Sequence, residues 1–372
     1  MSKQSRRDNA QEDGGDLMNL IFIGFGKVGQ SLAELIELRH AELRREYGLS
    51  ARVVGIVDRG GAAISKEGIE LAKAVCIKRL TGSVSNMHNV GRPYASALEV
   101  LEEEDADITV EITSTNIETG EPGLSHIKKA LSSGRQVVTT NKGALALFLP
   151  YLVDLASKNG TSFKFSGSVG GAMPIIEFAK NCLYGEKIDS IKGILNSTTN
   201  YILSRMAEKN LDLSSAVKEA KELGYAEENV LNDLDGLDTA CKLVILANWV
   251  LNRKVTLRDV KINGIRDSPH REILKAQQEG YAIKLIGSIT TEITVSPEKI
   301  SLKDPLCVAS SLNAIVFSCT HSGEHILIGR GAGPRETAWS ILRDIVSIQK
   351  SLEQQNITSL CLNNEYVKVH RK

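Results

Sequence analysis

The residues best equipped for proton chemistry lie between positions 222 and 242, a stretch that holds six carboxylates and ends in a lysine. A strongly apolar run follows and needs a helix start before it. Asp233 or Asp235 can supply that start, because a short carboxylate accepts hydrogen bonds from the free amides of a first helical turn. On such a helix Asp238 and Lys242 lie four residues apart on one face, within ion-pair reach.

Two interpretations of this pair are open. An exposed carboxylate–lysine pair at this spacing is common and contributes only about 0.3–0.5 kcal/mol. Lys242, however, directly precedes the apolar run Leu243–Leu251 and therefore lies at the edge of a buried surface. Burial of this kind lets a lysine exchange a proton near neutral pH. With Glu227 and Asp233 in the preceding loop, the pattern predicts a pocket wall with one ammonium and several carboxylates.

The elements that position this wall start with a dinucleotide fingerprint. A buried strand, Leu17–Ile23, runs into a GxGxxG segment, and a helix over 27–47 follows. The first glycine of such a segment allows a tight turn, the second lets the backbone approach a pyrophosphate, and the third lets the helix pack on the strand. The free amides of the helix then face the phosphates. The candidate cofactor residues here are Gly24, Phe25, Gly26, Lys27, Val28 and Gly29.

The end of the second strand, 52–57, leaves the choice of cofactor open. Asp58 is the acid that normally holds the ribose hydroxyls of NAD, whereas Arg59 is the residue type that accommodates the 2′-phosphate of NADP. Lys66 is near in sequence. Both charges are present, and the pattern favours NADP slightly.

Further strands end in polar residues where a doubly wound sheet forms its crevice. The strand over 108–113 ends at Thr113 and is followed by Ser114, and the strand over 136–140 ends just before Asn141 and Lys142. We expect the segment 61–95 to be irregular, apart from a short helix over 67–75. The regular alternation of strands and helices ends near Pro150, and a second glycine-rich segment, 329–333, opens a helix over 338–346.

Composition excludes several classes of protein. The chain has 372 residues with 45 basic and 45 acidic side chains, so nothing favours nucleic acid or an anionic membrane as a partner. The six cysteines are scattered without CxxC spacing and read as buried thiols in a reducing, cytoplasmic setting. His321 and His325 are four residues apart, but Glu324 is the one carboxylate near them in the sequence. Residues 1–16 are polar and are expected to form a disordered leader, and no apolar segment is long enough to span a membrane.

Several segments, in this order, resemble the homoserine dehydrogenase family from Met18 to about Val346. The segments are GFGKVG at Gly24, TSTNIETGEP at Thr113, TTNKGALAL at Thr139, SGSVGGAMPII at Ser166, GILNSTTNYIL at Gly193, LGYAE at Leu223, NDLDGLDTACKL at Asn232 and GRGAG at Gly329. The resemblance implies a reversible, NAD(P)-linked interconversion of L-aspartate 4-semialdehyde and L-homoserine, in threonine, methionine and isoleucine biosynthesis.

The resemblance also implies roles for individual residues. Lys242 looks like the family's proton donor, Asp238 its neighbour, and Lys142 a second active-site lysine that contacts cofactor and substrate. Substrate binding would fall to Glu227, Asp233 and Thr198, and a late cofactor contact to Gly331. The backbone carbonyls of Val169 and Gly171 would bind a sodium ion.

The implied fold is α/β: a Rossmann-type dinucleotide-binding domain plus an α+β catalytic and dimerisation domain with a mixed sheet. We expect the first domain over 17–150, completed by about 327–350, the second over 151–326, and a strand-bearing tail over 351–372. A homodimer is expected. The chain looks like the short form, without an ACT domain or a fused aspartokinase. Ser197 and the sequence Glu227-Glu-Asn-Val230 depart from the family pattern without removing a chemical group.

Two rival functions remain at this point. Another small NAD(P)-linked enzyme, such as an amino-acid dehydrogenase or a semialdehyde dehydrogenase, is possible, but the latter needs a reactive cysteine and Cys241 lies inside the helix beside Lys242. A cofactor-binding redox sensor without turnover would not need both lysines and the three carboxylates. The sequence does not decide which of Lys142 and Lys242 transfers the proton.

Overall fold

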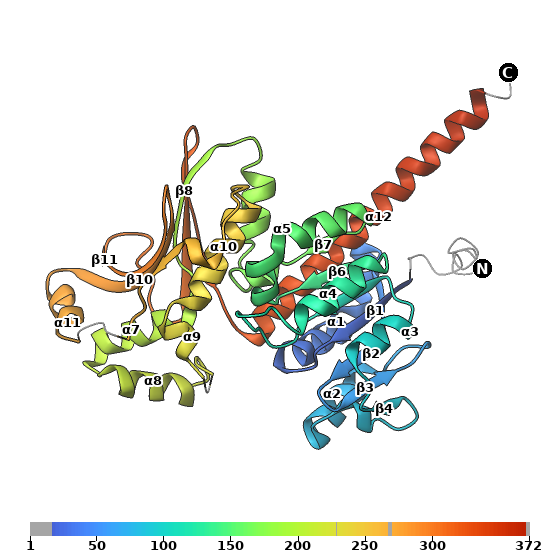
Figure 1. Ribbon diagram of the computed structural model, residues 1–372, viewed down its shortest axis with the longest axis horizontal. Coiled ribbons are helices and arrows are strands. Elements are labelled where there is room, and N and C mark those ends of the chain that lie inside the picture. Colours follow the sequence, from blue (N-terminus) through green and yellow to red (C-terminus); the bar gives the residue numbers. More distant parts are fainter. Residues whose placement is uncertain (1–16, 228, 267–269, 370–372) are drawn as a thin grey trace.

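The computed structural model describes residues 17–227, 229–266 and 270–369, which form two sheets with their helices (Figure 1). The expected leader, residues 1–16, lies outside the described residues. No helix in the described ranges combines the length and apolar character that crossing a membrane requires.

The first unit is a seven-stranded sheet of order β4-β3-β2-β1-β5-β6-β7. Five neighbouring strands run parallel, in the order β2-β1-β5-β6-β7. The strands β3 and β4 lie at one edge of the sheet, and each pairs antiparallel with its neighbour. The strands are β1 (Leu17–Ile23), β2 (Ser50–Asp58), β3 (Gly61–Ile64), β4 (Gly91–Pro93), β5 (Ile108–Glu111), β6 (Gln136–Thr139) and β7 (Phe163–Lys164).

Helices cover both faces of this sheet, because its central strands are apolar on both sides. One face packs against α1 (Lys27–Tyr47), α2 (Leu71–Thr81) and α12 (Pro334–Val369), and the other against α3 (Ala97–Glu103), α4 (Gly123–Ser132) and α5 (Lys142–Lys158). Because β1, β5 and β6 run parallel, their carboxyl ends lie at the same edge of the sheet, which is where ligands bind in such sheets.

The second unit is a mixed six-stranded sheet of order β13-β12-β8-β10-β11-β9. Its strands are β8 (Ile188–Ile194), β9 (Val260–Ile262), β10 (Tyr281–Ile289), β11 (Ile293–Ser301), β12 (Leu312–Cys319) and β13 (Gly323–Arg330). Its helices are α6 (Ile175–Glu177), α7 (Ser197–Lys209), α8 (Leu213–Glu222), α9 (Leu231–Leu234), α10 (Leu237–Trp249) and α11 (His270–Gln278). Gly287 of β10 lets α10 approach closely, since an added Cβ would lie 2.9 Å from the Thr239 methyl group.

The two units are joined by packing as well as by the chain. One apolar cluster runs from α4 and α5 of the first unit through α10 to β10 and β12 of the second. After β13 the chain returns to the first unit as α12, which lies beside α1 (Figure 1). The α/β fold with a Rossmann-type sheet and a second, mixed sheet is thus confirmed.

Four expectations about elements are wrong. The segment 61–95 is not irregular: β3, α2, the short turn Val84–Asn86 and β4 occupy it. Its helix begins at Leu71 instead of 67, because Gly68 adopts a left-handed φ of 102° in a turn. The tail after 351 holds no strand as far as Val369, since α12 continues through it. The cysteines are not all buried, because Cys76 and Cys182 are exposed.

A fifth correction concerns the start of the helix that carries Lys242. Neither Asp233 nor Asp235 caps α10; its N-cap is Gly236, at a φ of 81°, and no side chain caps it. Asp233 lies instead within the separate turn α9. The sequence pattern predicted one helix start, whereas the acidic segment holds parts of two helices, α9 and α10. Gly236, in a left-handed conformation, lies between them and is the N-cap of α10. The expected boundary at Pro150 lies inside α5, and β7 still belongs to the first sheet.

Candidate active site

A buried carboxylate between two ammonium groups forms the centre of the site. Asp238 Oδ2 lies 2.7 Å from Lys242 Nζ on the same helix, and Asp238 Oδ1 lies 3.2 Å from Lys142 Nζ. Lys142 is the first residue of α5, directly after β6, so it comes from the first unit, whereas Asp238 and Lys242 come from the second. The site therefore lies where the two units meet.

Lys242 is held so that one of its hydrogens stays available. Its side chain is only 7 % exposed. Nζ donates to the Leu195 carbonyl oxygen at 2.5 Å and pairs with Asp238. An ammonium group has three N–H donors, so two protein partners leave one for a ligand.

Asn196 joins the two acids of the site. Its Nδ2 donates to Asp233 Oδ1 at 2.6 Å and to Asp238 Oδ2 at 2.9 Å, and its Oδ1 caps α7 by accepting from the Thr199 amide. In the sequence, Asn196 stands out only as part of the segment GILNSTTNYIL. An asparagine before a run of hydroxyl residues was the one available signal, and it indicates a cap rather than a bridge.

Electrostatics separate the two acids. Burial would raise the pKa of Asp238, but the ammonium groups of Lys142 and Lys242 outweigh it and hold this pKa well below the usual range. Burial, followed by the negative charge of Asp238, raises the pKa of Asp233 to about 6. The Asp238 charge in turn raises the pKa of Lys142. The site thus holds a permanent anion, an acid that titrates near neutrality and a cationic lysine.

The predicted substrate residues line the same region without all touching. Thr198 lies in the first turn of α7, and its hydroxyl donates to the Tyr225 carbonyl at 3.0 Å. Glu227 is exposed in the loop that follows, and within the described ranges no hydrogen bond or ion pair is seen for it. The structure therefore brings Asp233, Asp238 and both lysines together and leaves Glu227 on a neighbouring loop.

The three fingerprint glycines each meet a separate steric demand. Gly24 has a φ of 105°, and an added Cβ would lie 2.6 Å from the Ile112 oxygen. A Cβ on Gly29 would lie 2.8 Å from the Gly24 oxygen, whereas nothing lies within 4 Å of a Cβ on Gly26. No side chain caps α1, which begins at Lys27. Tight turn, open approach and close packing are the three features that a pyrophosphate site needs.

The remaining cofactor candidates lie around the same edge. Phe25 is buried, Val28 is partly buried and Ser114 is exposed, while the Thr113 hydroxyl contacts the Glu111 carboxylate. Gly331 lies against Asn313, whose amide group would be 2.0 Å from an added Cβ. Only glycine fits at position 331.

Asp58 is already occupied by protein donors. Its carboxylate accepts from Lys78 Nζ at 2.8 Å, the Ser83 hydroxyl at 2.7 Å, and the amides of Gly60 and Val84. Burial opposes the charge, but these donors lower the pKa of Asp58 overall. Arg59 beside it is exposed. Lys78 is twenty residues further along the chain, on α2, and lies beyond the end of the helix expected over 67–75, so the sequence pattern did not indicate its contact with Asp58.

The loop expected to bind sodium contacts α12. Val169 is fully buried, and the Gly171 carbonyl accepts a hydrogen bond from the Ser340 hydroxyl. Arg343 donates to the next carbonyl, that of Ala172, at 3.4 Å. One lone pair of the Gly171 oxygen is thus already used. Within the described ranges no group of three or more His, Cys, Asp or Glu side chains could hold a metal ion.

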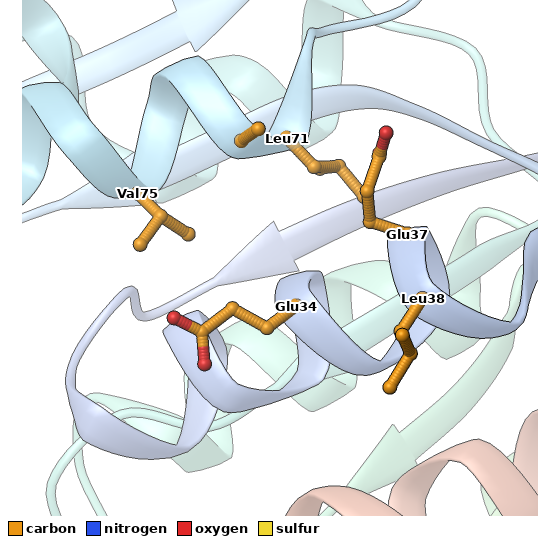
Figure 2. A pocket seen from close by; sticks show the side chains of 6 residues that line it. Glu34, Glu37, Leu38, Leu71 and Val75 are labelled. Carbon is orange, nitrogen blue, oxygen red and sulfur yellow. The ribbon is translucent and has the colours of Figure 1, made fainter.

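A shallow pocket lies elsewhere, between α1 and α2 (Figure 2). Glu34, Glu37 and the apolar side chains of Leu38, Leu71, Ala72 and Val75 line it. None of these residues belongs to the lysine–carboxylate cluster, so this pocket is not the candidate active site.

Known proteins are similar to this chain over most of its length. The family model for the homoserine dehydrogenase, NAD binding domain matches residues 24–166, and the model for homoserine dehydrogenase matches residues 174–346. The homoserine dehydrogenase of Methanocaldococcus jannaschii is 43 % identical over 91 % of this chain and 100 % of its own length.

Two further proteins are similar over most of their length. An NAD(+)-dependent homoserine dehydrogenase of Pseudomonas canavaninivorans is 37 % identical over 89 % of this chain and 96 % of its own. A solved hyperthermophilic archaeal homoserine dehydrogenase in complex with NADPH superposes with a TM-score of 0.79 at 32 % identity, covering 90 % of this chain and 98 % of that one. The chain therefore belongs to the homoserine dehydrogenase family.

Proposed function

We propose that Lys142, Asp238 and Lys242 carry out the NAD(P)-linked reduction of L-aspartate 4-semialdehyde to L-homoserine. The observation that supports this most is the pair of ammonium groups, one from each unit, on either side of one buried carboxylate. Such an arrangement suits a reaction in which negative charge develops on a carbonyl oxygen.

The reaction needs a hydride donor and a proton donor. A nicotinamide cofactor held at Gly24–Gly29 would supply the hydride that the aldehyde carbon accepts. Lys242 stabilises the developing oxyanion through its unused N–H and delivers the proton, while Asp238 and the Leu195 carbonyl hold its position. Lys142 completes the positive field from the other side. In the alternative, Lys142 delivers the proton and Lys242 supplies only positive charge. Variants at both positions distinguish the two cases.

We propose that the acids beside the lysines recognise the amino group of the substrate. Asp233 and Glu227 would pair with the ammonium, and Thr198 in the first turn of α7 would contact the amino-acid end. The buried Cys241 is no nucleophile for the rival semialdehyde dehydrogenase chemistry, because burial raises its pKa to about 12.

For the cofactor we propose a preference for NADP. Asp58 already accepts four protein donors, so it is poorly available to ribose hydroxyls, and the exposed Arg59 is placed for a 2′-phosphate. Gly24 to Gly29, Thr113, Ser114 and Gly331 would line the rest of the cofactor site. Sodium binding through Val169 and Gly171 remains part of the proposal.

A homodimer through the second sheet is proposed from its surface. Ile326 and Ile328 of β13 are 38 % and 52 % exposed, and they pair across the sheet with Val316 and Ala314 of β12. An apolar strip on a sheet face is typical of an interface.

We propose that the boundary between the two domains follows β7, near residue 166. The exposed thiols of Cys76 and Cys182 fit a reducing, cytoplasmic location.

The test is the loss of NADPH or NADH absorbance with L-aspartate 4-semialdehyde, in sodium and in potassium buffers. We expect rapid oxidation that homoserine plus oxidised cofactor reverses, faster with NADPH. Lys242→Ala should lower kcat by about a thousandfold or more while NADPH still binds. Wild-type protein that binds either cofactor without turnover would contradict the proposal and favour the redox sensor.

A further inference from the structure

A fully buried glutamate lies at the end of β5, beside the end of β6, and the mechanism above does not use it. Glu111 ends β5 and has no solvent-exposed surface. Its Oε1 accepts from the Thr113 amide at 3.1 Å and from the Thr113 hydroxyl, and its Oε2 accepts from the Thr139 hydroxyl at 2.8 Å. A buried carboxylate is costly unless hydrogen-bond donors satisfy it, and these three donors offset part of the desolvation cost of Glu111.

The direction of each hydrogen bond follows from the chemistry of the groups. An ionised carboxylate has no hydrogen, so both threonine hydroxyls must donate to it. Their oxygens then act only as acceptors on their other sides. The backbone N–H of Asn141 donates to Thr139 Oγ1 at 3.1 Å, and the side-chain Nδ2 of Asn141 donates to Thr113 Oγ1 at 3.4 Å, as this polarity requires.

The chain of hydrogen bonds ends at a residue of the active site. Asn141 Oδ1 accepts from the Ala144 amide and caps α5, whose first residue is Lys142. Because Oδ1 is used in the cap, Nδ2 is the end of the amide that faces Thr113. Glu111 is thus linked through two threonines and one asparagine to the lysine that pairs with Asp238.

Packing around this network leaves no room for adjustment. An added Cβ on Gly123, at the start of α4, would lie 2.2 Å from Asn141 Nδ2 and 3.3 Å from Glu111 Oε1. An added Cβ on Gly143 would lie 2.0 Å from the Asn116 oxygen, in the loop after Thr113. His126 Nδ1 is 3.8 Å from Glu111 Oε1, which is within ion-pair distance but beyond hydrogen-bond distance. The hydrogen bonds that the carboxylate accepts therefore come from the neutral groups of Thr113 and Thr139.

We propose that Glu111 is a positioning residue that holds the ends of β5 and β6 and the first residue of α5, Lys142, in register with the bound cofactor. It also fixes the polarity of Thr113, whose oxygen can offer only a lone pair toward a ligand. The group that this oxygen suits is an N–H donor, such as the carboxamide of a nicotinamide ring. The inference rests on the proposed roles of Lys142 and Thr113.

The first variant is Glu111→Gln, which keeps the shape and exchanges one acceptor oxygen for a donor NH₂. One threonine hydroxyl must then turn round, and the polarity of the network breaks. We expect kcat to fall about 10- to 100-fold, since small displacements of reacting groups have effects of this size. The Kd of NADPH, measured by fluorescence titration, should change less than about threefold, because the pyrophosphate contacts at Gly24–Gly29 remain. A deuterium isotope effect with labelled NADPH should rise as hydride transfer becomes slower.

Glu104→Gln is the matched control. Glu104 is also a buried glutamate of the first unit, but it lies before β5, at the opposite edge of the sheet, beside Arg92. We expect it to lower the melting temperature without changing kcat or the isotope effect. Equal losses of stability in both variants, with unchanged kcat per folded molecule, would show that Glu111 only stabilises the fold.

A second variant keeps the test decisive if Glu111→Gln does not fold. Asn141→Asp preserves the cap on α5, because aspartate is an equally good cap, but places an acceptor against Thr113. It should show the same pattern: lower kcat, a raised isotope effect and a nearly unchanged Kd of NADPH. A folded Asn141→Asp protein with wild-type kcat would overturn the proposal.

A double variant separates this inference from the proposed function. If Glu111 acts through Lys142, then Glu111→Gln should add little to the effect of Lys142→Ala. Independent, multiplying effects would overturn the positioning role. Inactive wild-type protein, or wild-type turnover in Lys142→Ala, would instead contradict the proposed function itself.

Discussion

The carboxyl group of Asp233 occupies a site where burial and a neighbouring negative charge both oppose its ionisation, and its pKa is raised to about 6. If Asp233 pairs with the substrate ammonium, it must be charged to do so. We therefore expect kcat/KM for the semialdehyde to fall as the pH drops below about 6, approaching tenfold per pH unit for a single group. Steady-state rates between pH 5 and 8 measure this limb.

The variant Asp233→Asn tests this assignment, and Asp235→Asn, two residues further along the chain, is its control. Asp233→Asn should lower kcat/KM at pH 8 and remove the acidic limb. Asp235→Asn should leave both unchanged, because Asp235 is partly exposed and paired with Arg266 outside the cluster. An acidic limb that survives in Asp233→Asn would assign the titration to another group.

Lys284 is a buried lysine whose recorded hydrogen-bond partners are neutral. Its Nζ donates to Asn200 Oδ1 at 2.7 Å and to Ser204 Oγ at 3.0 Å, and burial lowers its pKa to about 8. Between pH 8 and the ordinary lysine value of 10.5 the unfolded chain binds more protons than the folded one. The free energy of unfolding should therefore rise with pH across this window, by a contribution of the order of 3 kcal/mol.

Lys284→Met removes this titration. Chemical denaturation between pH 7.5 and 10.5 should show a smaller rise for Lys284→Met than for wild type. Lys303→Met, at an exposed position after β11, is the control and should follow the wild-type curve. Parallel curves for Lys284→Met and wild type would show that Lys284 keeps an ordinary pKa.

At the scale of elements, an aromatic stack anchors the loop that carries Glu227. The rings of Tyr201 on α7 and Tyr225 lie 4.4 Å apart and nearly parallel. The Tyr201 hydroxyl donates to Glu219 of α8 at 2.7 Å, and Arg205 binds the same carboxylate. The loop is thus fixed to two helices through one ring.

Loss of that ring should affect substrate binding more than chemistry. An aromatic pair is worth about 0.5–1.5 kcal/mol, so Tyr225→Ala should raise KM for the semialdehyde about 2- to 10-fold with little change in kcat. Steady-state kinetics give the split directly. Tyr184→Ala, at an 89 % exposed position, is the control and should change neither value. A fall in kcat alone would mean that the loop does not bind substrate.

The same scale shows what the sequence could predict. The sequence predicts the bounds of β1 and α1 as the structure has them. Glycines mark the turn between them, and Gly48 ends the helix in a left-handed conformation. The pair Asp238–Lys242 followed from helical spacing alone. The segment 61–95 could not be predicted, because β3 has only four residues, three of them small, and its pairing depends on the neighbouring β2. Likewise, no local pattern connects Asn196 to Asp233, 37 positions away.

At the scale of the whole molecule, α12 links the last strand of the second unit to the core of the first. Ile341, Ile345 and Ile348 of α12 are fully buried and belong to the same apolar cluster as Leu32 and Ile36 of α1. The nucleotide-binding sheet therefore completes its core with a segment about 300 residues further along the chain. The two units should consequently unfold together, in one cooperative transition.

Removal of one buried side chain from this contact tests that coupling. Ile345→Ala deletes fully buried atoms and should cost about 2–5 kcal/mol, lowering the melting temperature of the whole protein. Leu38→Ala, on α1 but 82 % exposed, should cost less than about 0.5 kcal/mol. Differential scanning calorimetry should show a single peak that shifts as one in Ile345→Ala. Two separate peaks, with only the first shifted, would show that the units are independent and that α12 connects them without coupling their stability.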